Sequence, residues 1–598
     1  MRKLFTLLSV IFACVVVANA ANNANYGWYL GGGGATGADR SADVVTDANG
    51  NIFTANTFAN TASFNGVAVT GSPKGSGANY DNCLLINKIS PSKTTLWTIY
   101  SNAGVVTPIA MATTPSGDLI VTGTMRAVVT SPVTYTANIV DAGNNITTFS
   151  GLGNSIVQSF VAKFNSSGIL QWVKELDSSA SKDKVVTASA IAADASGDVY
   201  VAGNFGSTVL LPGGTSLTLT NTTTNSFIVK LNAADGSEAW HLNTTIGVIV
   251  SEVIPALTYG DDGYLYAAGD FKNAATPVAI TIGGVSFTPS IGADLALIKF
   301  STTGSISYIQ ERASLSASLK AVRVKDIAVK NGKVFVGGSF NGYDGGIQFS
   351  SGALTTVSTN TNLNGFVAAF NSTSGADLWQ KGVFSPGITD IDGLAVGNDG
   401  YLYAFGSYAN KPLSGSADVV NFGNSKTIAD TPTTNSAADL FLVSYAPTDG
   451  TTTELHTVAS SATYETANSL ANYNGNLYLL GTTNASPVTF ENNSTYTTLG
   501  TYDIILVNYT TPATGISQVK TGDALFAYAD KANHVLVVKQ AENVVSARLV
   551  DVTGRTLVST LNTGDLLQIN TSGVATGIYI LQLTTSDGQV SSQRILVQ

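Results

Sequence analysis

Residues 194–203 read Asp-Ala-Ser-Gly-Asp-Val-Tyr-Val-Ala-Gly, and this short stretch decides the fold. It joins a polar turn that contains Gly197 to a run of β-branched and aromatic residues, which favours a strand. Similar stretches occur six more times, so seven copies of one unit follow each other along the chain. The glycines of these turns stand 66 to 80 residues apart, at Gly50, Gly117, Gly197, Gly263, Gly332, Gly400 and Gly475. A period of this length indicates a repeat protein in which each unit is one supersecondary motif.

Each repeat has a second apolar run after its first hairpin, such as Phe-Ile-Val-Lys-Leu at 227–231. A further turn and a strand that often contains Trp follow it. Four antiparallel strands per unit predict an all-β fold, a seven-bladed β-propeller over residues 21–520. A ring of blades closes best when one blade takes strands from both chain ends. Residues 26–30, around Trp28, and residues 515–519 are the two candidates for that closing strand, and we favour the first.

The repeats resemble the SBBP-like β-propeller repeats of exported bacterial proteins. Residues 194–203 carry the best match to the core pattern of that family, and the resemblance extends over residues 26–520. It implies the fold. It implies no catalytic residues, because the family has no common activity.

The first 20 residues have the features of a signal peptide. Arg2 and Lys3 precede an apolar run, and Ala-Asn-Ala at 18–20 is typical of a cleavage site, so we expect cleavage after Ala20. An alternative is a lipoprotein box that ends at Cys14. No later apolar run is long enough to predict a transmembrane segment.

Residues 523–598 follow a different pattern of short strands, which predicts a small Ig-like β-sandwich. This segment closely resembles the type A C-terminal sorting domain of the type IX secretion system of Bacteroidetes. The residues that carry the resemblance are Asp551, Gly554, Arg555, Gly577, Tyr579, Arg594 and Val597. The resemblance implies the type IX secretion machinery as a partner. We therefore expect a protein that is secreted or displayed on the outer cell surface.

Composition excludes several functions. Only 11% of the residues are charged, the net charge is −10, and Lys and Arg do not cluster, so nucleic acid is not expected as a partner. The three histidines, His241, His456 and His534, stand far apart, and no phosphate-binding loop is present, so neither a metal nor a cofactor is predicted. The acids of the turns are interpreted as turn formers rather than calcium ligands: Asp47, Asp194, Asp261, Asp262 and Asp399.

Carboxylates are the remaining candidates for chemistry. Asp390 and Asp392 precede an inner strand, where a propeller would place them at the rim of its central channel. Glu252, Lys325 and Asp326 are expected at the same rim. A pair of carboxylates is the catalytic apparatus of many glycosidases. The alternative interpretation is that these residues are solvated side chains at the channel mouth.

The long connections within the repeats gather on one face of the predicted ring, where a binding function is expected. Their aromatic residues are candidate binding residues: Tyr135, Phe149, Tyr343 and Tyr496. The alternative is that these connections form extra hairpins, as residues 278–287 suggest. The five Trp residues are assigned to blade packing rather than to sugar stacking.

The function predicted from these features is non-enzymatic: binding, adhesion or scaffolding through the long-loop face, with a glycan or a protein as ligand. The alternative is an extracellular carbohydrate-active enzyme that uses Asp390 and Asp392. A purely structural role in a surface layer is the third possibility.

Overall fold

Strands are the regular elements of the residues that the computed structural model describes, and no helix occurs among them. The predicted all-β class is therefore confirmed. Within the described part of the chain, no helix is long and apolar enough to cross a membrane. The chain divides into a first unit that ends at Thr511 and a second unit, Pro512–Gln598. The described residues are 25–35, 37–71, 82–126, 128–130, 134–150, 158–178, 186–206, 208–218, 224–245, 249–273, 277–290, 292–315, 322–341, 346–355, 363–385, 387–409, 419–429, 438–460, 464–484, 486–511, 526–530, 534–539, 544–551, 555–561, 567–585 and 590–597.

The third repeat shows how the sequence unit folds. It forms four consecutive antiparallel strands: β15 (Val186–Ala193), β16 (Val199–Phe205), β19 (Asn225–Leu231) and β20 (Glu238–Thr245). The turn between β15 and β16 needs a glycine because Gly197 has a φ of 82°. Asp194 Oδ1 accepts hydrogen bonds from the backbone N–H groups of Ser196 and Asp198, which fixes this turn.

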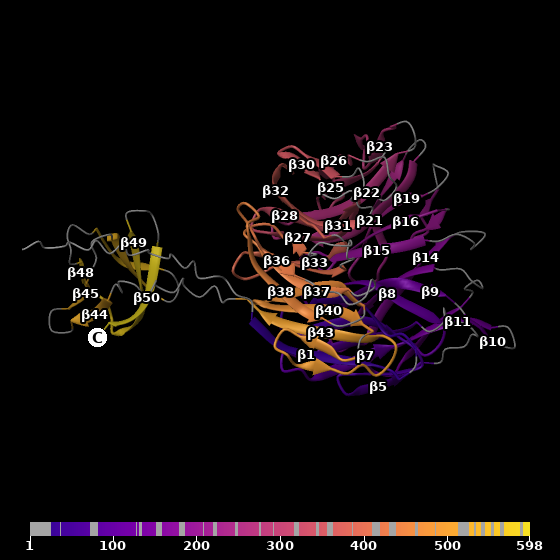
Figure 1. The fold of residues 1–598 in the computed structure, drawn as a ribbon, viewed down its shortest axis with the longest axis horizontal. Helices are drawn as coiled ribbons and strands as arrows, with labels where there is room; N and C mark the ends of the chain where they lie inside the picture. The colour runs from indigo at the N-terminus through magenta and orange to yellow at the C-terminus, as the bar shows by residue number, and fades with distance from the viewer. Residues whose placement is uncertain are drawn as a thin grey trace, which may run out of the picture. The chain divides into compact units, whose positions relative to one another are not determined.

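The described residues of the first unit contain seven sheets with this four-strand core (Figure 1). The first two are β2 (Arg40–Thr46), β3 (Ile52–Phe58), β6 (Cys83–Ile89) and β7 (Thr95–Tyr100), then β8 (Val105–Thr113), β9 (Leu119–Arg126), β13 (Gln158–Phe164) and β14 (Leu170–Ser178). After the third sheet come β21 (Ile249–Tyr259), β22 (Leu265–Asn273), β25 (Ala293–Phe300) and β26 (Ile306–Arg312), then β27 (Val322–Lys330), β28 (Lys333–Asn341), β31 (Leu363–Asn371) and β32 (Asp377–Val383). The last two are β33 (Ile388–Val396), β34 (Leu402–Ala409), β37 (Asp439–Tyr445) and β38 (Thr452–Ser460), then β39 (Glu465–Tyr473), β40 (Asn476–Thr483), β43 (Asp503–Thr510) and β1 (Asn25–Gly33).

The first strands of these sheets contact one another in sequence order. Contacts run from β2 through β8, β15, β21, β27 and β33 to β39, and β39 contacts β2 again. The N-terminal strand β1 pairs antiparallel with β43, with Tyr29 opposite Val507 (Figure 1). The favoured pairing of the Trp28 strand with the last repeat is thus confirmed, whereas residues 515–519 lie outside the described residues.

Apolar side chains fill the space between neighbouring sheets. Val161 and Trp172 of the second sheet pack in one cluster with Val201 and Phe227 of the third. Similar clusters lie between the other sheets, including one that joins the seventh sheet to the first. Each sheet therefore buries both faces only because it has a neighbour on either side.

The long second-to-third-strand connections form short outer hairpins. Five of them extend the sheet of the preceding repeat, since β4 pairs with β1, β11 with β7, β17 with β14, β23 with β20 and β41 with β38. The alternative interpretation of the long loops as hairpins is confirmed for these segments. The strands are β4 (Thr61–Phe64), β5 (Val67–Thr70), β10 (Val128–Thr130), β11 (Thr134–Val140), β12 (Ile146–Ser150), β17 (Val209–Leu210), β18 (Ser216–Leu217), β23 (Ile280–Ile282), β24 (Val285–Phe287), β29 (Gly346–Phe349), β30 (Gly352–Thr355), β35 (Val419–Asn421), β36 (Thr427–Ala429), β41 (Val488–Phe490) and β42 (Thr495–Tyr496).

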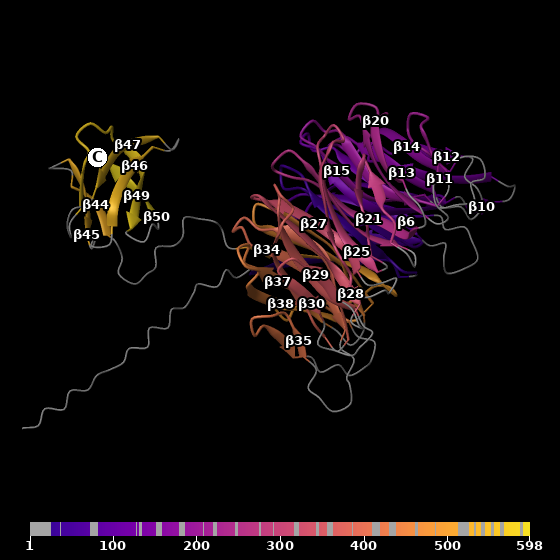
Figure 2. The same ribbon diagram turned by 90° about the horizontal axis from the view of Figure 1, so that it is seen from above.

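The second unit contains two antiparallel sheets among its described residues (Figure 2). One consists of β44 (Phe526–Asp530), β45 (Val535–Lys539) and β48 (Leu567–Asn570). The other consists of β47 (Thr556–Leu561), β46 (Val544–Val550), β49 (Gly577–Thr585) and β50 (Val590–Val597). Leu536 and Ile569 of the first sheet share a buried cluster with Leu549 and Leu581 of the second, so the two sheets enclose one core.

Candidate functional site

A β-bulge interrupts the first strand of each of the seven described sheets at the same place. In β27, for example, Val324 pairs with Gly338 and Asp326 with Gly337, which leaves Lys325 outside the ladder. Such a bulge turns one extra side chain away from the regular alternation. In β21 the irregularity leaves out two residues, Ile254 and Pro255. One unpaired residue from each of the seven strands lines a cavity of about 410 Å³: Ala42, Ile109, Ser189, Pro255, Lys325, Asp392 and Asn468.

This ring of bulge residues is chemically divided. The first, second and fourth sheets supply Ala42, Ile109 and Pro255, which are apolar. The fifth, sixth and seventh sheets supply Lys325, Asp392 and Asn468, which are polar and follow each other around the ring. The third sheet supplies Ser189, which lies between Ile109 and Pro255 in the ring and donates its hydroxyl to the carbonyl oxygen of Ile254. The ring therefore has a polar arc from the last three sheets and a largely apolar arc, with one serine, from the first four.

Lys325 joins two carboxylates of the sixth sheet. Its Nζ lies 3.1 Å from Asp392 Oδ1 and 3.5 Å from Asp390 Oδ2. Asp390 Oδ1 is buried and has no hydrogen-bond partner among the described residues. The two predicted catalytic candidates are thus brought together, with a lysine between them and the site carrying one excess negative charge when all three groups are ionised.

Burial and the neighbouring Asp390 raise the pKa of Asp392 to about 7, although Lys325 acts in the opposite direction. Burial alone would lower the pKa of Lys325, but the carboxylates of Asp392 and Asp390 outweigh it and raise that pKa. Lys325 therefore stays protonated at neutral pH, while Asp392 exchanges its proton in the physiological range.

Asp326 lies beside this group but has a structural role. Its Oδ2 accepts a hydrogen bond of 2.7 Å from the backbone N–H of Leu394 in the next sheet. Asp43 does the same in the first sheet, where its Oδ2 accepts from the N–H of Met111. Burial raises the pKa of Asp326 to about 7 and that of Asp43 to about 6. The predicted rim residue Asp326 thus links two sheets, and the side chain of Glu252 lies outside the described residues.

An exposed aromatic ring stands near the two carboxylates. Tyr464 is 45% exposed, and its pKa is raised first by burial and then by the negative charges of Asp392 and Asp390. Its backbone is held by hydrogen bonds in both directions with Asn484. Tyr464 is not among the candidate residues that the sequence predicted. Its place just before β39 was a usable signal, because Asp390 also stands near the start of an inner strand.

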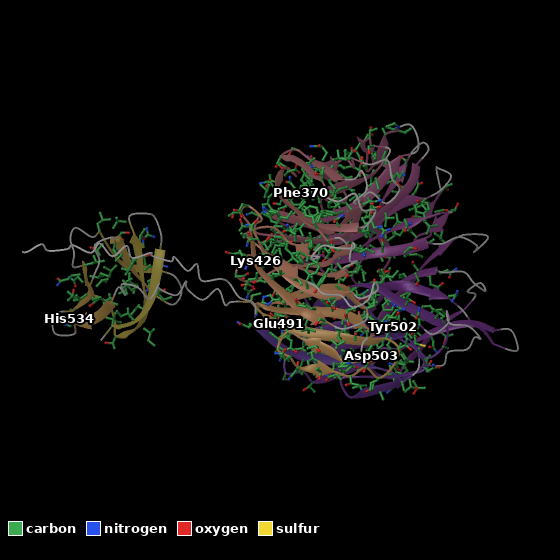
Figure 3. The ribbon with its side chains drawn as sticks, in the orientation of Figure 1. Phe370, Lys426, Glu491, Tyr502, Asp503 and His534 are labelled. Carbon is green, nitrogen blue, oxygen red and sulfur yellow. The ribbon has the colours of Figure 1, made fainter. Side chains whose placement is uncertain are left out.

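A second aromatic residue, Tyr502, carries the guanidinium of Arg40 at 4.3 Å from its ring centre. Tyr502 precedes β43, next to Asp503 (Figure 3). Arg40 begins β2, so the Arg40–Tyr502 pair joins the first and seventh sheets. A parallel bridge between Ala38 and Tyr502 holds the same two segments.

The aromatic residues predicted to bind a ligand through the long loops do not line this cavity where the structure describes them. Phe149 is 3% exposed and packs into the core between the first two sheets. Tyr496 is half-buried, and its hydroxyl donates a hydrogen bond of 2.6 Å to Asp503 Oδ2. The backbone of Tyr135 pairs with Val129 in an outer hairpin, its side chain lies outside the described residues, and Tyr343 lies outside them altogether.

The tryptophans and the lysines of the third strands connect neighbouring sheets. Trp172 Nε1 donates to the carbonyl oxygen of Ala233, in a turn of the next sheet, and its ring lies against Gly236 of that turn. Lys163 Nζ donates to the same carbonyl and pairs with Asp118 at 3.2 Å. The same arrangement recurs for Trp97 with Ser166 and Gly168, Trp240 with Thr302 and Gly304, Tyr308 with Ser372 and Gly375, and Trp379 with Pro447 and Gly450. These contacts account for four of the five tryptophans by packing, and Trp28 packs against the cluster between the seventh and first sheets. Ion pairs within one sheet account for Asp47, Asp194 and Asp262.

Several candidate sorting residues meet in the second unit. Arg555 Nε donates to Asp551 Oδ2 at 3.0 Å, and Tyr579 Oη donates to the carbonyl of Ala575. Gly577 pairs with Val597, and Arg594 pairs through its backbone with Ile580. Asp551, Arg555, Gly577 and Tyr579 line one surface pocket, whereas Gly554 lies outside the described residues.

Comparison with known families identifies this second unit. Residues 531–598 match the family described as "Secretion system C-terminal sorting domain". The chain is therefore a cargo of the type IX secretion system. It is a secreted or cell-surface protein, as the resemblance implied. No curated protein matches the sequence.

Solved structures with similar segments have low sequence identity to this chain. Quinohemoprotein alcohol dehydrogenase ADHIIG from Pseudomonas putida HK5 is 10% identical, with 83% of this chain and 78% of that chain covered and a TM-score of 0.31. Trypanosoma rangeli sialidase is 9% identical over 85% and 86% of the two chains, with a TM-score of 0.32. PorZ of Porphyromonas gingivalis is 12% identical over 95% and 100%, with a TM-score of 0.14. Similarity of this degree identifies neither a shared site nor a shared activity.

Proposed function

We propose that the chain is an exported seven-bladed β-propeller that binds a ligand at the cavity lined by its bulge residues. In this proposal residues 1–20 are a signal peptide cleaved after Ala20, residues 21–520 form the propeller, and residues 523–598 form an Ig-like sorting domain. The closed series of contacts among the first strands supports seven blades.

The charged group in the bulge ring is the observation that carries the binding function. The ring accepts Ala42, Ile109 and Pro255 at equivalent positions, so the fold does not require charge there. Moving an ionised side chain out of water costs free energy. The side chains of Asp392 and Asp390 are only 11% and 16% exposed, whereas that of Lys325 is 38% exposed. Lys325, Asp390 and Asp392 are therefore better explained by a ligand than by folding.

Binding can be tested on the mature full chain by screening immobilised glycans and surface proteins. A Lys325→Met variant should lose the interaction. Lys330→Met is the matched control, because Lys330 ends the same strand and is 53% exposed in its side chain. A ligand bound equally by both variants and by the unchanged protein would contradict a site at this cavity.

One observation favours a second function, an extracellular carbohydrate-active enzyme. Burial and the neighbouring Asp390 raise the pKa of Asp392 to about 7, and a carboxyl group with a raised pKa can act as the general acid of a glycosidase. Turnover of a glycan that disappears in both Asp390→Asn and Asp392→Asn would establish this enzyme. Binding without turnover would leave the first proposal in place.

A further inference from the structure

We infer that the cavity takes the terminal unit of a neutral, hydroxyl-rich chain, such as the end sugar of an uncharged glycan, and that Tyr464 contacts the unit behind it. This inference rests on the proposed binding function and specifies its ligand. It follows from the shape, the hydrogen-bonding groups and the charges of the site.

The shape of the cavity favours a chain end. The first strands of seven sheets line it, so a ligand enters along the axis of the ring rather than from the side. A volume of about 410 Å³ lies toward the small end of ligand-binding pockets, which are about 300–1,000 Å³. This space suits one or two sugar units and not a folded protein loop.

The polar arc offers both donors and acceptors. Lys325 donates, the carboxylate of Asp392 accepts, and the amide of Asn468 can do both. Asp390 is not part of the lining, but its Oδ2 lies 3.5 Å from Lys325 Nζ and helps to hold that ammonium group in place. A hydroxyl group also donates and accepts, so neighbouring hydroxyls of a sugar match this mixture.

The charges reject both ionic classes of ligand. The group carries one excess negative charge when all three side chains are ionised and none when Asp392 is protonated, so it gives an anion such as a uronic acid or a phosphate no net attraction. The place that an ammonium group would take between those carboxylates is already filled by Lys325 Nζ, at 3.1 and 3.5 Å from them. A neutral ligand meets neither obstacle.

Apolar contacts complete the match. Ala42, Ile109 and Pro255 face the polar arc across the ring, and the C–H face of a sugar can pack against such side chains. Tyr464 is 45% exposed and comes before the bulge residue of β39, as Asp390 comes before the bulge residue of β33. Both residues therefore stand at the same end of the cavity, where the aromatic ring of Tyr464 can contact the second unit of the chain.

The test is calorimetric titration of the mature full chain with three sets of oligosaccharides of equal length. One set is neutral (maltose, cellulose and mannan fragments), one carries amines (chitosan fragments), and one carries uronic acids (alginate fragments). We expect binding from the neutral set only. Asp390→Ala and Tyr464→Ala should each weaken it at least tenfold, and the control Lys330→Met should not change it.

A gain of function makes the test sharper. Lys325→Met vacates the ammonium position between the carboxylates, so this variant should bind chitosan fragments that the unchanged protein rejects. Failure of all neutral fragments, or preference for a charged set by the unchanged protein, would overturn the inference. If a protein ligand then proves sensitive to Asp390→Ala, the proposed binding site stands without the glycan. If Asp390→Ala weakens the binding of no ligand, both the neutral-glycan inference and the proposed binding site fail.

Discussion

The contact between Trp172 and Gly236 gives the most direct test of how neighbouring sheets hold together. Gly236 has a φ of 68°, and a Cβ added there would lie 2.7 Å from Cε3 of Trp172. We therefore expect Gly236→Ala to be harmful for two reasons, a backbone penalty and a steric clash. Gly400→Ala measures the backbone penalty alone, because Gly400 has a φ of 80° and no atom lies within 4 Å of an added Cβ.

The magnitudes follow from these distances. A left-handed backbone costs a residue with a Cβ about 1–2 kcal/mol, which both alanine variants share. Overpacking against the indole adds about 1–3 kcal/mol in Gly236→Ala only. The free energy of unfolding should thus fall by about 1–2 kcal/mol in Gly400→Ala and by about 2–5 kcal/mol in Gly236→Ala.

A double-mutant cycle isolates the contact. Trp172→Ala alone should cost about 3–5 kcal/mol, because the 8% exposed indole and its hydrogen bond to Ala233 are both lost. In Trp172→Ala/Gly236→Ala the clash is absent, so the double variant should be less destabilised than the two single changes together by about 1–3 kcal/mol. The measurement is urea unfolding followed by far-ultraviolet circular dichroism. Additive effects, or equal losses in Gly236→Ala and Gly400→Ala, would refute the sheet-to-sheet contact.

Three further predictions concern pH and export. Burial raises the pKa of Asp326 to about 7. The stability that protonated Asp326 contributes is therefore fully present below its unfolded pKa near 4 and is lost as the pH rises through 7. Asp326→Asn should reduce the fall in melting temperature between pH 5 and pH 8. Burial opposes protonation of His456, but Glu454 and Glu491 outweigh it and raise its pKa to about 9, so its contribution is present below pH 6.5 and lost through pH 9. His456→Gln should therefore cost about 1–3 kcal/mol at pH 6 and little at pH 10 in thermal unfolding. Deletion of residues 523–598 should leave the protein in the periplasm, as cell fractionation would show; surface display without them would contradict the sorting assignment.

The local turns made much of the fold predictable. Gly197 and its six counterparts adopt positive φ, and acids such as Asp194 cap the same turns, so the strand boundaries follow from the chemistry of a few adjacent residues. The closing strand was predictable for a similar reason. Trp28 belongs to the same residue pattern as the fourth strands of other repeats, and its strand does pair with β43.

The outer hairpins limited the prediction of the binding residues. A loop aromatic looks exposed in a sequence, but Phe149 is buried because its hairpin folds back over the preceding sheet. Tyr496 also lies in an outer hairpin, and its hydroxyl donates a hydrogen bond to Asp503. Which sheet a hairpin joins depends on contacts between different repeats, and no pattern within one repeat records those contacts.

The bulges explain why the site itself could be predicted only in part. Asp390 and Asp392 were placed near the channel because they begin an inner strand, yet the sequence does not show that one residue per strand leaves the ladder. A bulge residue makes no ladder hydrogen bonds, so its side chain is nearly free of the packing rules that constrain its neighbours. Ala42, Pro255 and Asp392 can therefore occupy equivalent positions in one fold. The ring of bulge residues is therefore where a repeat protein can change its ligand at the smallest cost in stability. Exchanging residues such as Lys325 between bulge positions should alter ligand binding while leaving the sheets intact.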